Sequence, residues 1–245
     1  MIYIYGVVRE GVNLAPRDGV YGSALELIAK DGFSLVVEPV SASVIEATLG
    51  EGARGNEALL HTAVLAHQAV LNALVEQTDL LPFRFGTVVD DDKAAQNLIS
   101  AQRGSFEAVL ARVEGHLEWG VKITRTEEKA APEKPASGAD YLRQLSAKKN
   151  AVSDKQAEIS SLCNAVAQCV HDRSRMAEPL PLRSSDARER RLVNLACLLP
   201  RGGDDAFKAA VNEAVAGFGT LPVQIEISGP WPPFSFANVS EDAPA

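Results

Sequence analysis

The chain has 245 residues, and 46% of them are hydrophobic, which is enough to build the core of one large domain or of two ordinary ones. Its 24 Lys and Arg residues against 32 Asp and Glu residues give a formal net charge of −8, which argues against phosphate backbones and anionic membranes as partners. The three cysteines lack the density of a secreted disulfide scaffold, and no apolar run reaches the ~20 residues of a membrane span. We therefore expect a cytoplasmic protein that binds neither nucleic acid nor membrane.

The first 125 residues are predicted to alternate strands and helices. Strands are expected at 2–8, 33–40, 80–89 and 117–125, and helices at 21–30, 56–78 and 93–115. The Asp31-Gly32 pair is expected to end the first helix. Helix 56–78 is predicted from apolar residues at spacings of three and four, with His67 taking one place in the series. These apolar residues are Leu60, Val64, Leu71, Leu74 and Val75.

The second half is predicted to begin with a linker and a long helix. Residues 126–139 are charged and contain Pro, Ala, Ser and Gly, without a bulky apolar side chain, which is typical of a linker. Residues 140–175 contain no Pro or Gly, and their apolar residues follow a coiled-coil period, so we expect one side of this helix to be apolar. The residues of this side are Leu142, Leu145, Val152, Ile159, Cys163, Val166 and Val170. A strand at 191–200, a helix at 204–217 and a strand at 221–228 follow.

This order of elements predicts an α+β protein made of two ferredoxin-like modules, because a strand, an Asp-led helix and a strand occur in both halves. The expected domains are an N-terminal α+β domain (1–125), a linker (126–139) and a C-terminal α+β domain opened by the long helix (140–229). An extended tail rich in Pro and aromatic residues (230–245) completes the chain. Its prolines, Pro230, Pro232 and Pro233, exclude a helix or a central strand.

Three consecutive aspartates, Asp90, Asp91 and Asp92, could collect a divalent cation, since hard cations bind several oxygens at short range. Consecutive side chains do not point the same way, however, and no phosphate-binding loop accompanies them. Capping of the helix that follows is the favoured interpretation, because its first amides lack partners and its dipole attracts negative charge.

The cysteines and histidines suggest neither a metal site nor a catalytic centre. Cys163, Cys169 and His171 lie on one predicted helix, but their spacings do not place two zinc ligands on one face. His61, His67 and His116 suggest no nucleophile with a base and an orienting carboxylate. We therefore expect no cofactor and no enzymatic activity.

Arg84 lies between Phe83 and Phe85, and strand alternation would place both rings on one face, with Arg84 and Pro82 on the other. A buried arginine needs a carboxylate partner, because an unpaired guanidinium is costly to bury. Glu118 is a candidate. Both a structural ion pair and an exposed interaction face are open interpretations.

Six strings, in this order and at this spacing, resemble the gas vesicle protein F/L family over nearly the whole chain. They are YIYGVV (3–8), LPFRFGTVV (81–89), EWGVKI (118–123), YLRQLSAKK (141–149), NLACLLPR (194–201) and SGPWPPFSFA (228–237). The candidate interaction or family-motif residues within them are Tyr5, Gly6, Pro82, Phe83, Arg84, Phe85, Gly86, Glu118, Trp119, Gly120, Pro230, Trp231, Pro232, Pro233 and Phe234.

The resemblance implies a non-catalytic, chaperone-like accessory protein of gas vesicle assembly, located in the cytoplasm and at the gas vesicle. Its implied partners are the hydrophobic shell subunit, gas vesicle protein A, and other accessory proteins. The alternatives are a minor structural component of the shell and a metal- or nucleotide-dependent enzyme that uses Asp90 to Asp92. The candidate binding surfaces are a sheet edge, the apolar side of the long helix and the WPPFSF tail, whose aromatic residues could instead fold back onto their own domain.

Overall fold

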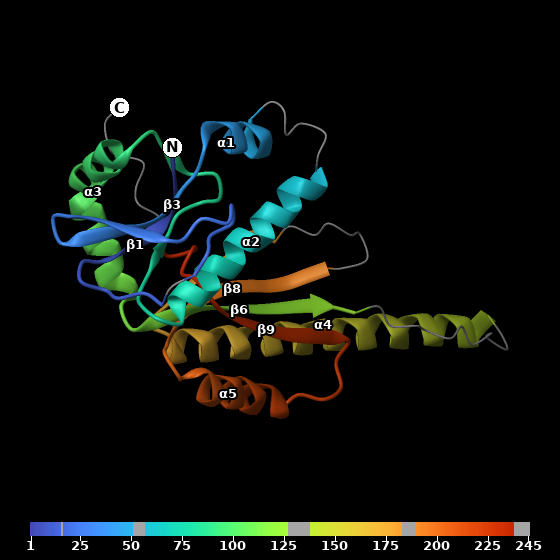
Figure 1. The fold of residues 1–245 in the computed structure, drawn as a ribbon. Coiled ribbons are helices and arrows are strands. Elements are labelled where there is room, and N and C mark those ends of the chain that lie inside the picture. Colours follow the sequence, from blue (N-terminus) through green and yellow to red (C-terminus); the bar gives the residue numbers. More distant parts are fainter. Residues whose placement is uncertain (16, 51–56, 127–137, 183–189, 238–245) are drawn as a thin grey trace. The chain divides into compact units, whose positions relative to one another are not determined.

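The computed structural model describes residues 1–15, 17–50, 57–126, 138–182 and 190–237, and only the backbone of residues 138–148 and 190. The chain divides into two compact units (Figure 1). Unit 1 comprises residues 1–118 and 230–245, and unit 2 comprises residues 119–229. Most of the expected linker lies outside the described residues.

Unit 1 is built on an antiparallel sheet in the order β2-β3-β1-β4, with β5 also paired to β1. The strands are β1 (Ile2–Arg9), β2 (Glu26–Lys30), β3 (Phe33–Pro39), β4 (Leu81–Pro82) and β5 (Val88–Val89). The helices are α1 (Ala42–Leu49), α2 (Glu57–Val75) and α3 (Asp92–Val113).

Both faces of this sheet are covered, because every residue of β1 from Ile2 to Val8 is buried. Tyr3 and Tyr5 lie in a core cluster with Leu71 and Leu74 of α2. On β3, the Phe33 ring contacts Phe106 of α3, with ring centroids 6.0 Å apart. The sheet is therefore enclosed between α2 and α3, and a continuous apolar run is what such a strand requires.

The helix predicted at 21–30 is wrong, because Glu26–Lys30 forms strand β2 in a hairpin with β3. Lys30 pairs with Phe33, which leaves Asp31 and Gly32 as a two-residue loop. Both loop residues have positive φ values, 52° and 87°. Asp-Gly favours this mirror-image hairpin turn, since its twist matches that of the strands. The pair that was expected to end a helix instead joins two strands.

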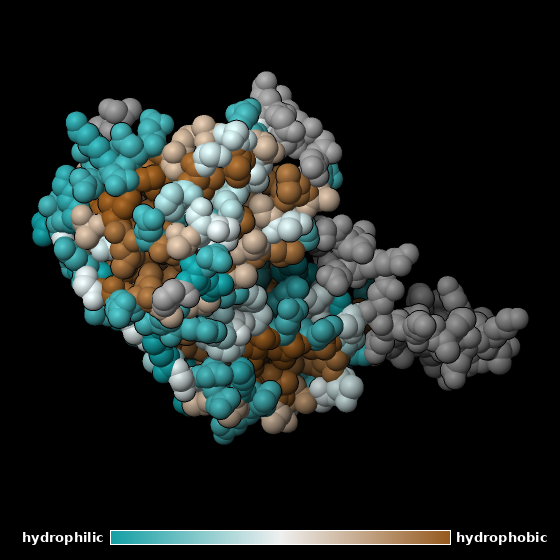
Figure 2. Space-filling view, in the orientation of Figure 1, coloured by the Kyte–Doolittle hydropathy of each residue, from teal (hydrophilic) through white to brown (hydrophobic). Residues whose placement is uncertain are grey.

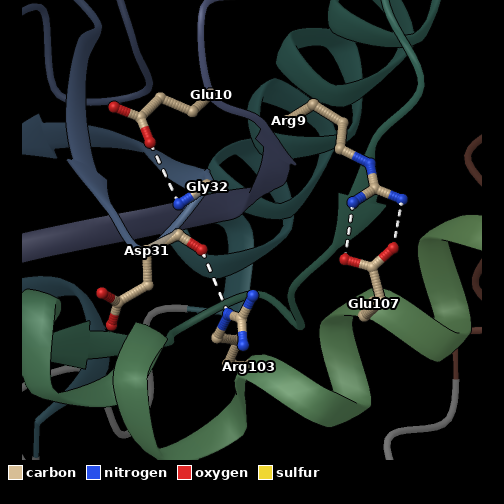
Figure 3. A network of polar contacts seen from close by, with 6 residues as sticks. All are labelled: Arg9, Glu10, Asp31, Gly32, Arg103 and Glu107. Carbon is tan, nitrogen blue, oxygen red and sulfur yellow. Dashed lines mark hydrogen bonds and ion pairs between the residues drawn. The ribbon is translucent and has the colours of Figure 1, made fainter.

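Polar contacts tie this hairpin and β1 to α3 (Figure 3). Arg9 Nη1 and Nη2 donate to Glu107 Oε2 and Oε1 at 2.7 and 2.8 Å, a bidentate ion pair. Arg103 Nε donates to the Asp31 carbonyl at 3.3 Å, and Ser100 Oγ to the Asp31 carboxylate at 2.7 Å. The hairpin turn is thus held against α3 by both its backbone and its side chain.

The strand predicted at 80–89 is interrupted. β4 and β5 both pair with β1, and the five residues between them bulge away from the sheet, opposite only Ile4 and Tyr5. The Phe83 N–H donates to the Tyr5 carbonyl at 2.8 Å before the bulge, and the Ile4 N–H donates to the Thr87 carbonyl at 2.9 Å after it. The bulge closes in a turn in which the Thr87 N–H donates to the Arg84 carbonyl. Gly86, with φ of 88°, occupies the turn position that requires a positive φ.

Unit 2 has a four-stranded antiparallel sheet in the order β7-β8-β6-β9. Its elements along the chain are β6 (His116–Arg125), α4 (Gly138–Arg173), β7 (Met176–Pro179), β8 (Arg190–Pro200), α5 (Asp204–Ala216) and β9 (Val223–Trp231). Trp119, Val121 and Ile123 alternate along β6 and share one core with residues of α4 and α5. β6, expected as the last strand of the N-terminal domain, therefore belongs to the sheet of unit 2.

The long helix is confirmed. Among its described side chains, Ile159, Val166 and Val170 of the expected apolar side are buried, whereas Val152 of the same side is 62% exposed. A 36-residue helix is about 54 Å long, whereas the 11-residue β8 spans about 36 Å. The sheet is too short to cover the whole helix.

The N-cap of α3 gives a direct test of the favoured interpretation of the aspartates. Asp91 Oδ1 accepts the Ala94 N–H at 2.8 Å. Asp91→Ala should therefore lower the free energy of unfolding by about 1 kcal/mol, because this amide loses its acceptor. Asp90→Ala is the matched control, since Asp90 is equally exposed and does not cap the helix. Urea unfolding followed by circular dichroism would measure both, and equal effects would contradict the assigned cap.

Candidate functional site

The motif residues at the start of the chain shape the sheet beneath α2. Tyr5 is fully buried, and Gly6 pairs with Pro82 of β4. A Cβ atom at Gly6 would lie 2.5 Å from the Leu81 carbonyl oxygen, so the two backbones approach too closely for any side chain. Pro82 lies on an edge strand, where a missing N–H is tolerated.

The two phenylalanines of the bulge point to different places, contrary to the expectation that their rings share a face. The Phe83 ring contacts Phe106 of α3, with centroids 6.2 Å apart. The Phe85 ring contacts Tyr3 and His67, at 6.2 and 5.6 Å. Because the chain leaves the sheet between these residues, strand alternation no longer applies to them.

Arg84 is exposed at the first position of the bulge turn. The ion pair with Glu118 that the sequence left open does not form. The Glu118 carboxylate is 9% exposed and accepts the Ser235 N–H and hydroxyl, both at 2.7 Å. The structure therefore shows an exposed Arg84 and not a buried ion pair with Glu118.

The C-terminal motif begins in an edge strand and ends in the core of unit 1. Pro230 and Trp231 belong to β9, with Trp231 partly exposed, so the expected tail starts inside a strand. Pro232 and Pro233 are buried, Phe234 packs against the core cluster of unit 1, and Phe236 is fully buried. The aromatic residues after the prolines thus fold back, as one of the two interpretations of this segment predicts. Residues 238–245 lie outside the described part.

Trp119 and Gly120 have structural positions in unit 2. Trp119 is 5% exposed, and the Lys208 ammonium lies 4.9 Å from the centroid of its ring. Gly120 faces Ser228, whose hydroxyl would lie 3.0 Å from an added Cβ atom. A bulkier residue at 120 would therefore press on β9.

A buried cluster around His67 anchors α2 to the sheet. His67 Nδ1 lies 2.9 Å from the Tyr3 hydroxyl, and the Tyr5 ring stacks on the imidazole at 5.4 Å. The Tyr3 oxygen also accepts the Gly86 N–H at 3.2 Å, which links the bulge to the same cluster. Burial lowers the pKa of His67, with a smaller opposing effect from the backbone of Phe83. The imidazole is therefore neutral at pH 7.

Glu38 is a second buried polar group next to this cluster. Its carboxylate accepts the Tyr5 hydroxyl at 2.6 Å and the N–H groups of Tyr21 and Ser23 at 2.9 and 3.0 Å. The Tyr5 oxygen in turn accepts the Val20 N–H at 2.7 Å. Burial, reinforced by the hydrogen bond to Glu38, raises the pKa of Tyr5. These donors, from the described part of the chain, are neutral, and they fix the segment before β2 to the sheet.

Among the residues that the structure describes, no group of three or more His, Cys, Asp or Glu side chains could hold a metal ion. Asp91 caps α3 and Asp92 lies in its first turn, where negative charge is favourable. Cys163 and Cys169 are partly buried, and burial raises the pKa of both thiols. Raised thiol pKa values disfavour the reactive thiolate form.

An exposed apolar surface of unit 1 lies on the N-terminal half of α2. Leu60 and Val64, two members of the apolar series that predicted this helix, are 40% and 39% exposed. Together with the exposed Val44 of helix α1, which contacts α2, they form what we call the α2 apolar face. Figure 2 shows brown, hydrophobic side chains at the surface over these two helices. Exposed apolar side chains that gather in this way typically mark an interaction site.

Within the described ranges, α2 is also the one helix that is long and apolar enough to cross a membrane, judged by length and composition alone. Helices that pack in protein cores have the same composition. The C-terminal half of α2 is such a helix, with His67, Val70, Leu71, Leu74 and Val75 buried.

Sequence reasoning placed His67 in the apolar series of α2 but did not identify its buried contacts, and it missed Glu38 altogether. The signal for Glu38 was a single charge inside the apolar strand FSLVVEPV. Such a charge is buried only when hydrogen bonds satisfy it, and here the donors come from residues 15 and 17 positions earlier and from β1. The exposure of Leu60 and Val64 had no local signal.

Comparison with known proteins gives a consistent result. The family model described as gas vesicle synthesis protein GvpL/GvpF matches residues 1–238. Gas vesicle protein L of Streptomyces sp. (strain CB03234) is 31% identical, over 98% of this chain and 94% of that protein. Gas vesicle protein F2 of Halobacterium salinarum is 24% identical, over 97% and 92%.

Two crystal structures share the fold. The gas vesicle protein GvpF from Microcystis aeruginosa superimposes with a TM-score of 0.68 at 18% identity, over 97% of this chain and 98% of that one. GvpF from Anabaena sp. PCC7120 gives a TM-score of 0.66 at 17% identity, over 98% and 97%.

The buried His67 predicts a pH dependence of stability. Because its pKa is lowered in the folded chain, the unfolded chain binds a proton that the folded chain does not as the pH falls below about 6.5. Wild-type stability should therefore decrease between about pH 7 and pH 5. His67→Gln removes this contribution, so its stability relative to wild type should improve as the pH falls. Chemical denaturation at each pH would measure the difference.

His61→Gln is the matched control, because His61 is exposed on the same helix. Its stability relative to wild type should change little with pH. A His67→Gln difference that stays constant from pH 7 to pH 5 would contradict the assigned neutral, buried imidazole.

Proposed function

Because the chain belongs to the gas vesicle synthesis protein GvpL/GvpF family, we propose that it is a non-catalytic accessory protein of gas vesicle assembly. It binds the hydrophobic shell subunit, gas vesicle protein A, and keeps it soluble during nucleation or growth of the shell. Other gas vesicle accessory proteins are its further partners. It acts in the cytoplasm, at the surface of the forming vesicle.

The observation that carries this proposal is the α2 apolar face. An apolar shell subunit aggregates when its surface is left in water, and covering that surface requires a complementary apolar surface on a well-charged carrier. This chain combines both, since its formal charge is −8 and Leu60 and Val64 are exposed on a rigid helix. The net charge would keep a complex of the two proteins in solution.

The motif residues support a binding role rather than a reactive one. Tyr5, Gly6 and the bulge residues fix the geometry of the sheet and of the buried cluster that holds α2 on it. Glu118 holds the segment around Ser235 by hydrogen bonds. Arg84 differs from these residues, because it is exposed on a turn fixed by its neighbours. We include Arg84 as a polar contact for a second accessory protein.

We also propose that unit 2 follows the ferredoxin-like plan. Its elements occur in the order β6-α4-β7-β8-α5-β9, which is a β-α-β-β-α-β sequence, and its sheet order is β7-β8-β6-β9. Unit 1 has a different order, in which three strands come before the first helix.

Co-expression of the tagged chain with the shell subunit of the same organism tests the proposed function. The expected result is a soluble complex of defined stoichiometry on size-exclusion chromatography, in contrast to precipitation of the shell subunit expressed alone. Precipitation of the shell subunit in the presence of the unbound protein would overturn direct holding. Retention of the protein in washed vesicles at a fixed ratio to the shell subunit would instead indicate a structural component of the shell.

A further inference from the structure

The sheet edges of unit 1 are poor binding sites for another chain. The edge strand β2 is short and carries Glu26 and Lys30 at its two ends. The opposite edge is formed by β4 and β5, which have two residues each, and one of these residues is Pro82, which has no N–H to donate. Charges, prolines and short length are the features by which proteins protect sheet edges from strand addition.

The tail is also a poor binding site, because Pro232, Pro233 and Phe236 are buried within the structure. In the long helix α4, the apolar residues from Ile159 onward form the core of unit 2. Of its expected apolar series, Val152 alone is exposed among the residues with described side chains. A single exposed valine does not make a binding surface.

The α2 apolar face differs from these surfaces because it continues the buried side of a core helix. Leu60 and Val64 are one helical turn apart, and Leu60 precedes the buried Leu71 by about three turns on the same side. The side that packs on the sheet in the C-terminal half therefore extends into the N-terminal half, where it is exposed. Leu65 lies roughly 100° around the helix from Val64 and is outside this side.

The charge of α2 restricts what can occupy this face. From Ala58 to Val75 the helix contains no Asp, Glu, Lys or Arg, although 23% of the chain is charged. An occupant would therefore find no charged side chain on α2 beyond Glu57 and should itself be uncharged where it makes contact, since an unpaired charge is costly to bury. A second copy of this chain would bring two bodies of charge −8 together, which mutual repulsion opposes.

The backbone of α2 restricts the form of the occupant. Its amides and carbonyls are bonded within the helix, so it cannot add a strand, whereas the ridge formed by Leu60 and Val64 can enter the groove of another helix. We propose that the α2 apolar face docks one uncharged apolar helix of the shell subunit, over about two helical turns and by helix-to-helix packing. This inference rests on the proposed function and adds the site and the form of contact to it.

The test compares two variants in the co-expression experiment. In the double variant Leu60→Gln/Val64→Gln, the recovery of shell subunit per mole of tagged protein should fall about tenfold, as expected for loss of two central contacts. Leu65→Gln is the matched control. It introduces the same polar group at a more exposed leucine of the same helix, 57% exposed, and should bind like wild type.

Val44→Gln on α1 provides an independent variant outside α2 and should also lower recovery. Circular dichroism and thermal unfolding of each purified variant verify the fold, and Val44→Gln decides the outcome if the double variant does not fold. Retained binding by Val44→Gln and by a folded double variant would overturn the docking site while leaving the proposed function intact.

Two further outcomes are distinguishable. If wild type itself recovers no shell subunit, the proposed function fails and this inference fails with it. If sedimentation equilibrium shows that wild type dimerises and the double variant is monomeric, the face is an interface between copies of this chain, which overturns the assigned occupant.

Discussion

Strand β1 must be covered on both faces, and the rest of unit 1 follows from this requirement. Its residues from Ile2 to Val8 are all buried, so one helix alone cannot shield it. α2 meets the face that carries Tyr3 and Tyr5, and α3 covers the other. The strand itself carries two hydroxyl groups into the core, and each needs a partner there. His67 satisfies one and Glu38 the other, which is why two polar residues lie among apolar ones.

These buried polar contacts connect segments that are far apart along the chain. The Tyr3 hydroxyl contacts His67 on α2 and the Gly86 amide in the bulge, and the Tyr5 hydroxyl contacts Glu38 and Val20. Hydrogen bonds of this kind have strict geometry, so they specify one position of α2 where apolar packing alone would tolerate several. A rigidly held α2 presents its exposed half in a fixed position, which lowers the entropic cost of binding a partner.

Sequence patterns predicted the long elements better than the short ones or the surfaces. α2, α3 and α4 follow from apolar periodicity, and a cap among Asp90 to Asp92 follows from their position before α3. The segment 21–30 was misassigned because Asp-Gly can end a helix or turn a hairpin, and only pairing with β3 decides between them. Periodicity also indicated that one side of α2 and of α4 is apolar, but it did not indicate how far along each helix this side is buried. Burial of Leu60 or Val152 depends on how far the neighbouring sheet extends, and this is a property of the tertiary structure.

Unit 1 is discontinuous in the sequence, because residues 230–237 belong to it although they follow the whole of unit 2. During translation, residues 1–118 leave the ribosome without Phe234, Phe236 and the Ser235 groups that bind Glu118. Unit 2 is encoded without interruption between residues 119 and 229, so it can fold as soon as it emerges. The N-terminal unit can therefore be completed only after the whole of unit 2 has been synthesised. A prematurely released chain would contain the α2 helix without a completed core beneath it.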